Sequence, residues 1–129
     1  MANKACKEVI TSEEACKARL GSIADALYAI GGKWKLRIIV ALKDGAKRFN
    51  ELHRLIDGLS AKVLSAELKD LELNGFVQRT VYDTKPVVVE YELTEYSETL
   101  GGVLEALSEW GAMHRETVKR SLRKKKAVA

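Results

Sequence analysis

The chain has 129 residues, enough for one domain, and its 47% hydrophobic and 31% charged content excludes a disordered protein. No apolar run could cross a bilayer, and residues 1–10 lack the apolar core of a signal peptide, so we expect a cytoplasmic location. The net charge of +4 is unevenly distributed along the chain. Residues 33–85 hold eleven basic and seven acidic residues, residues 86–116 hold one basic and seven acidic, and residues 117–129 hold six basic and no acidic residue.

Four helices are predicted in the first part of the chain, over residues 12–29, 33–43, 49–56 and about 60–73. Ser12 and Ser60 are the expected N-caps of the first and fourth helices, because their hydroxyl oxygens can accept from free N–H groups. Glycine-containing pairs separate the helices, namely Gly31-Gly32, Asp44-Gly45, Asp57-Gly58 and Asn74-Gly75.

After the fourth helix the apolar period changes from 3.6 to 2. Two alternating runs, 76–82 and 87–93, flank a polar turn and predict a β-hairpin. Thr94 is expected to cap one long last helix, whose basic end at 123–126 we expect to be disordered. This end either adds unspecific attraction to DNA or is simply solvated. Short helix, tight turn, helix and hairpin in this order indicate a winged helix-turn-helix, a mainly α fold with a small β-hairpin (α+β).

No repeat or linker divides the chain. We therefore expect an N-terminal extension at 1–11, a winged helix-turn-helix domain with flanking dimerisation helices at 12–116, and a basic tail at 117–129.

The fourth helix has the features of a DNA-recognition helix. On a helical wheel Leu68 and Leu71 fall within about 40° of Leu64, so this face is expected to be buried. The acidic residues lie on the flanks, and the opposite face is small and basic, with Lys62, Ser65, Ala66 and Lys69. Such a face suits the major groove, although a merely solvated face is the alternative.

Further cations surround this helix. Lys47 and Arg48 precede the third helix, where a cation can hold a phosphate strand, and Lys85 lies at the tip of the hairpin. Arg79 on the first strand could contact DNA or pair with Glu90 or Glu92 across the hairpin, and a lysine at a tip also serves solubility. The candidate DNA-binding residues are Arg48, Ser60, Lys62, Ser65, Lys69, Arg79 and Lys85.

The last helix carries an apolar stripe that includes Trp110 and Met113. It is either core of one protomer or a seam against a second copy, and we favour the seam because two recognition helices are needed on DNA. The candidate dimer residues are Ile23, Leu27, Tyr28, Leu100, Val103, Leu107 and Trp110.

The sequence offers no catalytic constellation or phosphate-binding loop, so we expect no enzymatic activity and no cofactor. His53 is interpreted as a surface residue or phosphate contact, and His114 as a packing residue. Cys6 and Cys16 lie far from both histidines and lack the spacing of a zinc site, so no metal is expected.

Several strings resemble the HxlR-type regulators, a winged-helix family related to the MarR group. They include Ile30–Lys35 (IGGKWK), Lys47–Leu52 (KRFNEL), Leu68–Val77 (LKDLELNGFV), Val89–Thr94 (VEYELT) and Leu107–Gly111 (LSEWG). Together with Arg79–Tyr82 (RTVY), these strings fall in order between residues 16 and 114. The resemblance implies a prokaryotic homodimeric DNA-binding regulator whose first and last helices form the dimer contacts.

Many regulators of this kind sense oxidants or electrophiles through an N-terminal cysteine, for which Cys16 is the candidate. It lies further from Gly31 than the commonest family spacing, and Lys17 follows it where the family usually has proline. Neighbouring Lys17 and Arg19 would favour the thiolate. The alternative is an incidental or buried cysteine.

The function predicted is that of a sequence-specific transcriptional regulator, a homodimer on double-stranded DNA at a pseudo-palindromic operator. The alternative is a winged-helix module that binds proteins and not specific DNA. Salt separates the two, because phosphate contacts release counterions whereas apolar contacts respond far less to ionic strength.

Overall fold

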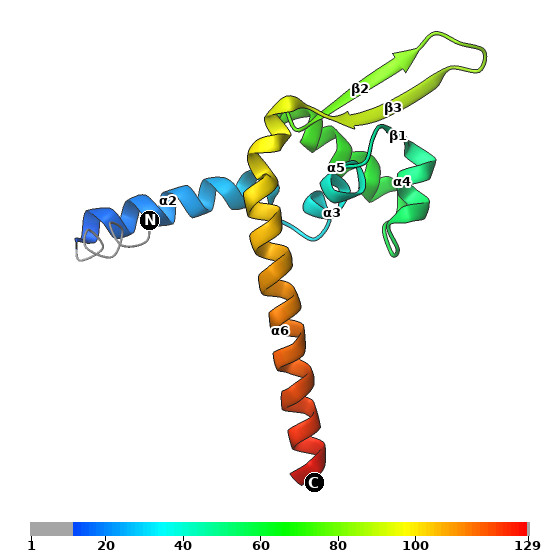
Figure 1. Ribbon diagram of the computed structural model, residues 1–129. Coiled ribbons are helices and arrows are strands. Elements are labelled where there is room, and N and C mark those ends of the chain that lie inside the picture. The colour runs from blue at the N-terminus through cyan, green and yellow to red at the C-terminus, as the bar shows by residue number, and fades with distance from the viewer. Residues whose placement is uncertain (1–11, 129) are drawn as a thin grey trace. The chain divides into compact units, whose positions relative to one another are not determined.

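A computed structural model describes residues 12–128 and divides the chain into two compact units, one ending at Leu93 and one beginning at Thr94 (Figure 1). The first unit contains α2 (Glu13–Ile30), α3 (Lys35–Ala41), β1 (Lys47–Arg48), α4 (Phe49–Leu55), α5 (Ala61–Leu73), β2 (Val77–Tyr82) and β3 (Val88–Leu93). The second contains the 3₁₀ helix η1 (Glu95–Leu100) and α6 (Gly101–Val128). This architecture is mostly helical with a small antiparallel sheet, which confirms the predicted fold class.

The two predicted serine caps form as expected. The Ser12 hydroxyl oxygen accepts from the Ala15 N–H at 3.1 Å, and that of Ser60 accepts from the Val63 N–H at 3.2 Å. Each bond satisfies a donor that the first helical turn leaves without an intrahelical partner. The start of α5 is therefore fixed by its own sequence.

The turn between α4 and α5 requires glycine. Gly58 has a φ of +80°, a left-handed conformation that costs glycine little and other residues more. A Cβ at this position would lie 3.8 Å from the Trp34 ring, an ordinary van der Waals contact, so the backbone conformation and not space explains the glycine. The tight turn brings α4 and α5 together over one apolar core, whose fully covered side chains are Ile38, Ile39, Leu42, Leu52, Leu64, Leu68 and Leu71.

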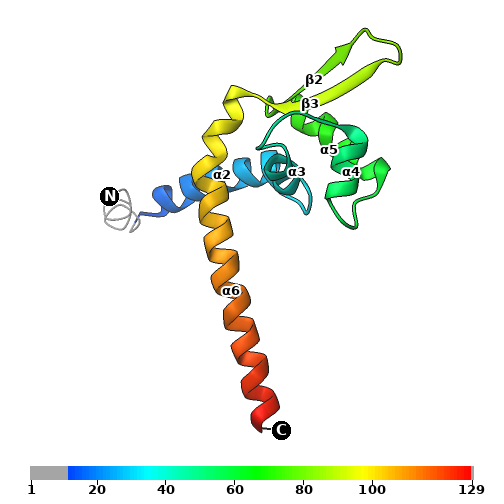
Figure 2. The same cartoon turned by 45° about the vertical axis from the view of Figure 1, so that its right-hand side comes forward.

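The hairpin that follows α5 is the wing (Figure 2). Strands β2 and β3 pair antiparallel from Val77 opposite Leu93 to Tyr82 opposite Val88, as the alternating pattern predicts. The two-residue strand β1 adds to the free edge of β3 and gives the order β1-β3-β2. β1 was not predicted, because two residues are too short to show a period.

The second unit differs from the prediction at both ends. Thr94 does not begin an α-helix directly: its carbonyl accepts from the Ser97 hydroxyl at 2.6 Å at the start of η1, and α6 begins only at Gly101. α6 then continues to Val128, so the expected disorder at 123–126 is wrong. Lysine, arginine, leucine and alanine are strong helix formers, and cations in the last turns interact favourably with the helix dipole.

Candidate nucleic-acid interface

The helix α5 presents its small, basic face to solvent. Leu64, Leu68 and Leu71 are buried, whereas Lys62, Ser65 and Lys69 are exposed on the other side. The wheel drawn from the sequence therefore gives the orientation of α5 correctly. Ser60 is exposed too, and its cap leaves the hydroxyl proton available to an acceptor such as a phosphate.

Lys35 compensates part of the acidic charge on one flank of α5 from within the protein, whereas Glu72 on the other flank is exposed. The Lys35 ammonium of α3 lies 2.8 Å from Glu67 and 3.6 Å from Asp70. The hydrogen bond to Glu67 raises the pKa of Lys35, although burial acts in the opposite direction. Only 13% of the Lys35 side chain and 16% of the Glu67 side chain are exposed, so this pair is sheltered from solvent. It reduces the negative field beside α5 and ties the helix to α3.

Two cations before α4 have different surroundings. The Lys47 ammonium pairs with the Asp44 carboxylate and lowers its pKa. Arg48 is exposed, and its backbone N–H donates to the Glu51 carboxylate at 2.8 Å. Among residues 12–128 no ion pair involves the Arg48 guanidinium, so Arg48 is better placed than Lys47 to bind an outside partner.

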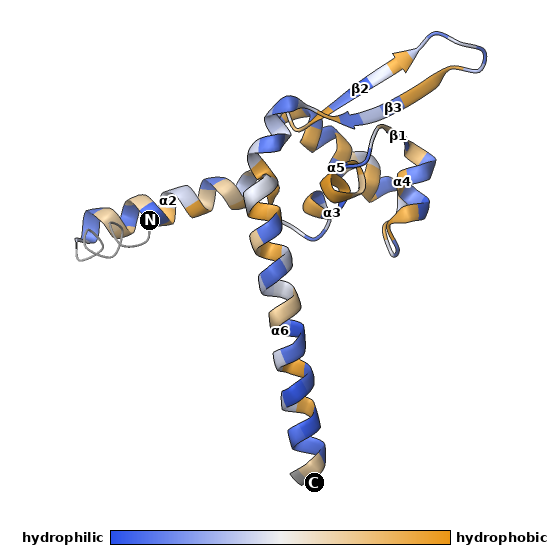
Figure 3. Ribbon diagram, in the orientation of Figure 1, coloured by the Kyte–Doolittle hydropathy of each residue, from blue (hydrophilic) through white to orange (hydrophobic). Residues whose placement is uncertain are grey.

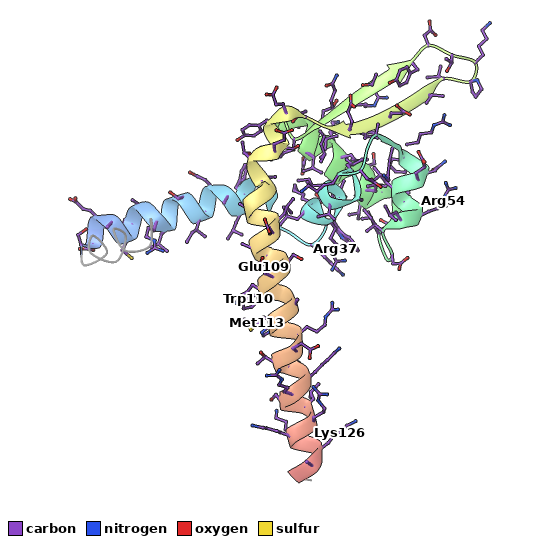
Figure 4. All side chains as sticks on the ribbon, viewed as in Figure 1. Arg37, Arg54, Glu109, Trp110, Met113 and Lys126 are labelled. Carbon is purple, nitrogen blue, oxygen red and sulfur yellow. The ribbon has the colours of Figure 1, made fainter. Side chains whose placement is uncertain are left out.

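A polar depression of about 570 Å³ lies beside Arg48 and contains a second guanidinium. Its lining residues are Ala46, Arg48, Asn50, Glu51, Arg54 and Glu90. Arg54 projects from α4 (Figure 4), and its planar fork matches the geometry of a phosphate group. Arg54 is not among the DNA-binding residues predicted from the sequence. Its position one helical turn after Asn50, on the helix before α5, would have indicated it.

The wing carries Arg79 and Lys85, both exposed. Arg79 lies opposite Tyr91 in the β2–β3 register, whereas Glu90 and Glu92 lie opposite Thr80 and Gln78. Paired residues share a face of the sheet, so both carboxylates point to the other side. The alternative that Arg79 pairs with Glu90 or Glu92 is therefore wrong, and its guanidinium stays on its own face of the wing.

Apolar side chains are exposed on α2 and, in the second unit, on α6. Tyr28 is 87% exposed and Trp110 58%, and the stripe on α6 continues beyond Met113 to Val118 and Leu122. Trp110 and Met113 project from the same side of α6 (Figure 4). The other exposed candidates are Ile23, Leu27, Val103 and Leu107. Leu100 differs from these: it is only 8% exposed and belongs to η1, so it has little surface to offer a partner.

The histidines lie against aromatic rings. His53 stacks on Phe49 with ring centroids 6.4 Å apart, and His114 stacks on Trp110 at 4.8 Å. His114 therefore packs against a neighbouring ring, although its side chain and that of Trp110 are both exposed. Between residues 12 and 128 no group of histidine, cysteine and acidic side chains is placed to hold a metal ion. Over the same range no helix is long and apolar enough to span a membrane.

An exposed basic helix held in a helix-turn-helix and followed by a two-stranded wing is the arrangement of a winged helix-turn-helix regulator. Comparisons with known proteins agree. The sequence model of the HxlR-like helix-turn-helix family matches residues 29–119. The chain therefore belongs to this family, and it is a transcriptional regulator of the HxlR and MarR type.

Individual relatives match most of the chain. The uncharacterized HTH-type transcriptional regulator YtcD of Bacillus subtilis is 45% identical over 93 residues, which are 72% of this chain and 74% of YtcD. The redox regulator HypR, in its oxidized form, is similar in structure with a TM-score of 0.68 and 39% identity over 71% of this chain and 95% of HypR. For the reduced form of the transcriptional regulator YodB from B. subtilis, the TM-score is 0.63 and the identity 38%, over 69% of this chain and 87% of YodB.

Proposed function

We propose that the protein is a non-enzymatic, sequence-specific DNA-binding regulator that acts as a homodimer in the cytoplasm, at the nucleoid. The observation that carries this proposal is the outer face of α5, where Lys62, Ser65 and Lys69 are exposed and the flanking carboxylate of Glu67 is occupied by Lys35. Small side chains permit close approach to base edges, and lysines reach guanine acceptors or phosphates. No cofactor is required for this activity.

Each other candidate residue has a role in the same complex. Arg48 and Arg54, beside the depression at the start of α4, hold the phosphate strand that flanks the groove. The Ser60 hydroxyl and the N-terminus of α5 contact a phosphate. Arg79 and Lys85 of the wing contact the backbone further along the duplex.

Two copies of α5 must lie about one turn of DNA apart to read a pseudo-palindromic operator. The exposed apolar side chains of α2 and α6 supply the surface for this pairing. A face with several large side chains in contact with water favours association, because burial of apolar area stabilises the dimer by roughly 25 cal/mol per Å².

Genomic footprinting of the purified protein, followed by titration of the recovered duplexes with salt, tests the proposal. We expect a protected site with two half-sites, and an affinity that falls steeply as salt rises because phosphate contacts release counterions. Binding to scattered sequences without half-sites, or an interaction with proteins that is insensitive to salt, would instead favour the winged-helix interaction module.

Cys16 is the proposed sensor of this regulator. The side chain is exposed, which excludes a buried cysteine within the protomer. On the α2 wheel it falls within about 40° of Leu20 and Leu27, so the thiol shares the apolar face that we assign to the dimer. Oxidation or alkylation there would place a new bond or group at the contact between two copies. HypR, a solved relative, is named a redox regulator.

Substitution Cys16→Ser is expected to abolish the effect of diamide or an electrophile on operator affinity, while affinity under reducing conditions stays within about twofold of wild type. Operator binding before and after treatment measures this. Cys6, which lies outside the described residues, provides the matched control: Cys6→Ser should respond like wild type. A full response in Cys16→Ser removes this thiol from the mechanism.

A further inference from the structure

The last three turns of α6 hold the densest charge in the chain. Between residues 119 and 126 six of eight positions are basic, and no acidic residue follows Glu116. All six side chains are exposed: Lys119, Arg120, Arg123, Lys124, Lys125 and Lys126. Figure 3 shows the helix becoming mostly hydrophilic towards this end, which we call the basic end of α6.

The cations of the basic end are largely uncompensated. Within residues 12–127 one ion pair involves them, between Lys119 and Glu116 at 3.8 Å, and both side chains are more than half exposed. Such a surface pair contributes little. Because the segment is helical to Val128, the charges are carried on a defined scaffold and do not lie along a coil.

Half of these cations point away from the apolar stripe of α6. With Leu107 at zero on the wheel, Val118 and Leu122 fall within about 60° and continue the stripe, as does Lys125. Arg120 and Lys124 fall within about 20° of Met113 and so border the stripe. Lys119, Arg123 and Lys126 lie about 100° or more from Leu107 and about 40° or more from every stripe residue. A second copy seated on the stripe would leave these three cations in solvent, so self-association does not account for them.

We propose that the basic end of α6 is a second DNA-binding surface, which contacts phosphates outside the base pairs that α5 reads. This inference rests on the proposed function. Residues 119–126 rise by about 10 Å along the helix, and a duplex carries roughly six phosphate charges over that length. The charge density of the segment thus matches that of duplex DNA.

The composition favours DNA over a membrane surface. A helix that lies in a lipid interface has a broad apolar face with aromatic and leucine side chains. The basic end has only Val118 and Leu122 on that side. Glu105, Glu109 and Glu116 lie opposite the stripe earlier in α6 and repel phosphate, so the contact is limited to the last turns. The family match ends at residue 119, so most of this surface lies beyond the matched residues.

The test replaces three cations of the basic end, in the variant Arg123→Gln/Lys124→Gln/Lys126→Gln, in the full chain. Two duplexes are compared: the footprinted operator cut back to its two half-sites, and the same operator with random flanking sequence on both sides. The charge-retaining variant Arg123→Lys/Lys124→Arg/Lys126→Arg is the matched control. Affinity is measured as a function of salt, and sedimentation checks the dimer.

We expect the affinity of wild type and of the control variant to be at least about 10-fold higher for the extended duplex than for the cut duplex. The glutamine variant should bind both duplexes with similar affinity. The slope of log K against log salt on the extended duplex should become shallower by about 2 to 5, because a dimer loses six cations and each phosphate contact contributes about 0.9. Affinity for the cut duplex and the choice of bases should not change.

An unchanged slope in the glutamine variant overturns the inference while leaving operator recognition by α5 intact. Loss of the dimer in that variant would assign the basic end to self-association. Capture of the protein by phosphatidylserine vesicles, with no change in the salt slope on DNA, would assign the basic end to lipid binding. Either result overturns the inference. If wild type binds neither duplex, the proposed function itself fails.

Discussion

Substitution Lys62→Glu should lower operator affinity by about 100- to 1,000-fold while the protein remains a folded dimer. Lys62 is exposed at the centre of the α5 outer face, so each copy loses a contact to base or phosphate and gains a repelled carboxylate. A loss of about 1.5–2 kcal/mol of binding free energy in each copy gives this decrease in affinity for a dimer. The fold should tolerate the change, because an acidic side chain in the first turn of a helix interacts favourably with its dipole.

The matched control is Lys43→Glu, an exposed lysine that follows α3 and lies outside α5. Both variants change the net charge equally, so a general loss of attraction to DNA would appear in both. We expect the control to stay within about threefold of wild type on the footprinted operator. Near-wild-type affinity of Lys62→Glu, or equal losses in the two variants, would refute the assigned recognition face.

The orientation of α5 could be predicted because a single period determines it. Leu64, Leu68 and Leu71 are spaced four and three residues apart, so they share one face of the helix. Burial of that face leaves Lys62 and Lys69 on the opposite face. The hairpin could be predicted for the same reason with a period of 2. Local signals were equally informative where a cap or a left-handed residue is obligatory, as at Ser60 and Gly58.

What the sequence did not reveal depends on contacts between distant residues. Lys35 lies 32 positions before Glu67, and no local pattern indicates that the two meet. Arg54 borders the same depression as Arg48 and Glu90 because α4 packs beside β3, which only the tertiary fold shows. The helical extension to Val128 was not predicted for a different reason. A run of like charges indicates disorder, whereas the residues that carry these charges have high helix propensity, and the propensity prevails here.

Truncation of the exposed stripe on α6 should separate the two copies. Trp110 is 58% exposed and stacks on His114, so Trp110→Ala removes a large surface side chain and opens no cavity in the protomer core. Aromatic side chains at the centre of an interface commonly cost 2 kcal/mol or more when truncated. Because a symmetric contact loses two of them, we expect the dimer dissociation constant to rise by about 100- to 1,000-fold.

Sedimentation equilibrium measures that shift, and circular dichroism should show unchanged helix content because alanine is the stronger helix former. Glu109→Ala is the control, since Glu109 neighbours Trp110 in sequence but lies on the opposite side of α6, about 160° from Leu107 on the wheel. The dimer should survive that change. Operator affinity should fall with Trp110→Ala at concentrations where the protein is monomeric, because a single α5 reads only one half-site. A Trp110→Ala protein that still sediments as a wild-type dimer would place the seam elsewhere and leave the exposed face of α2 to form it.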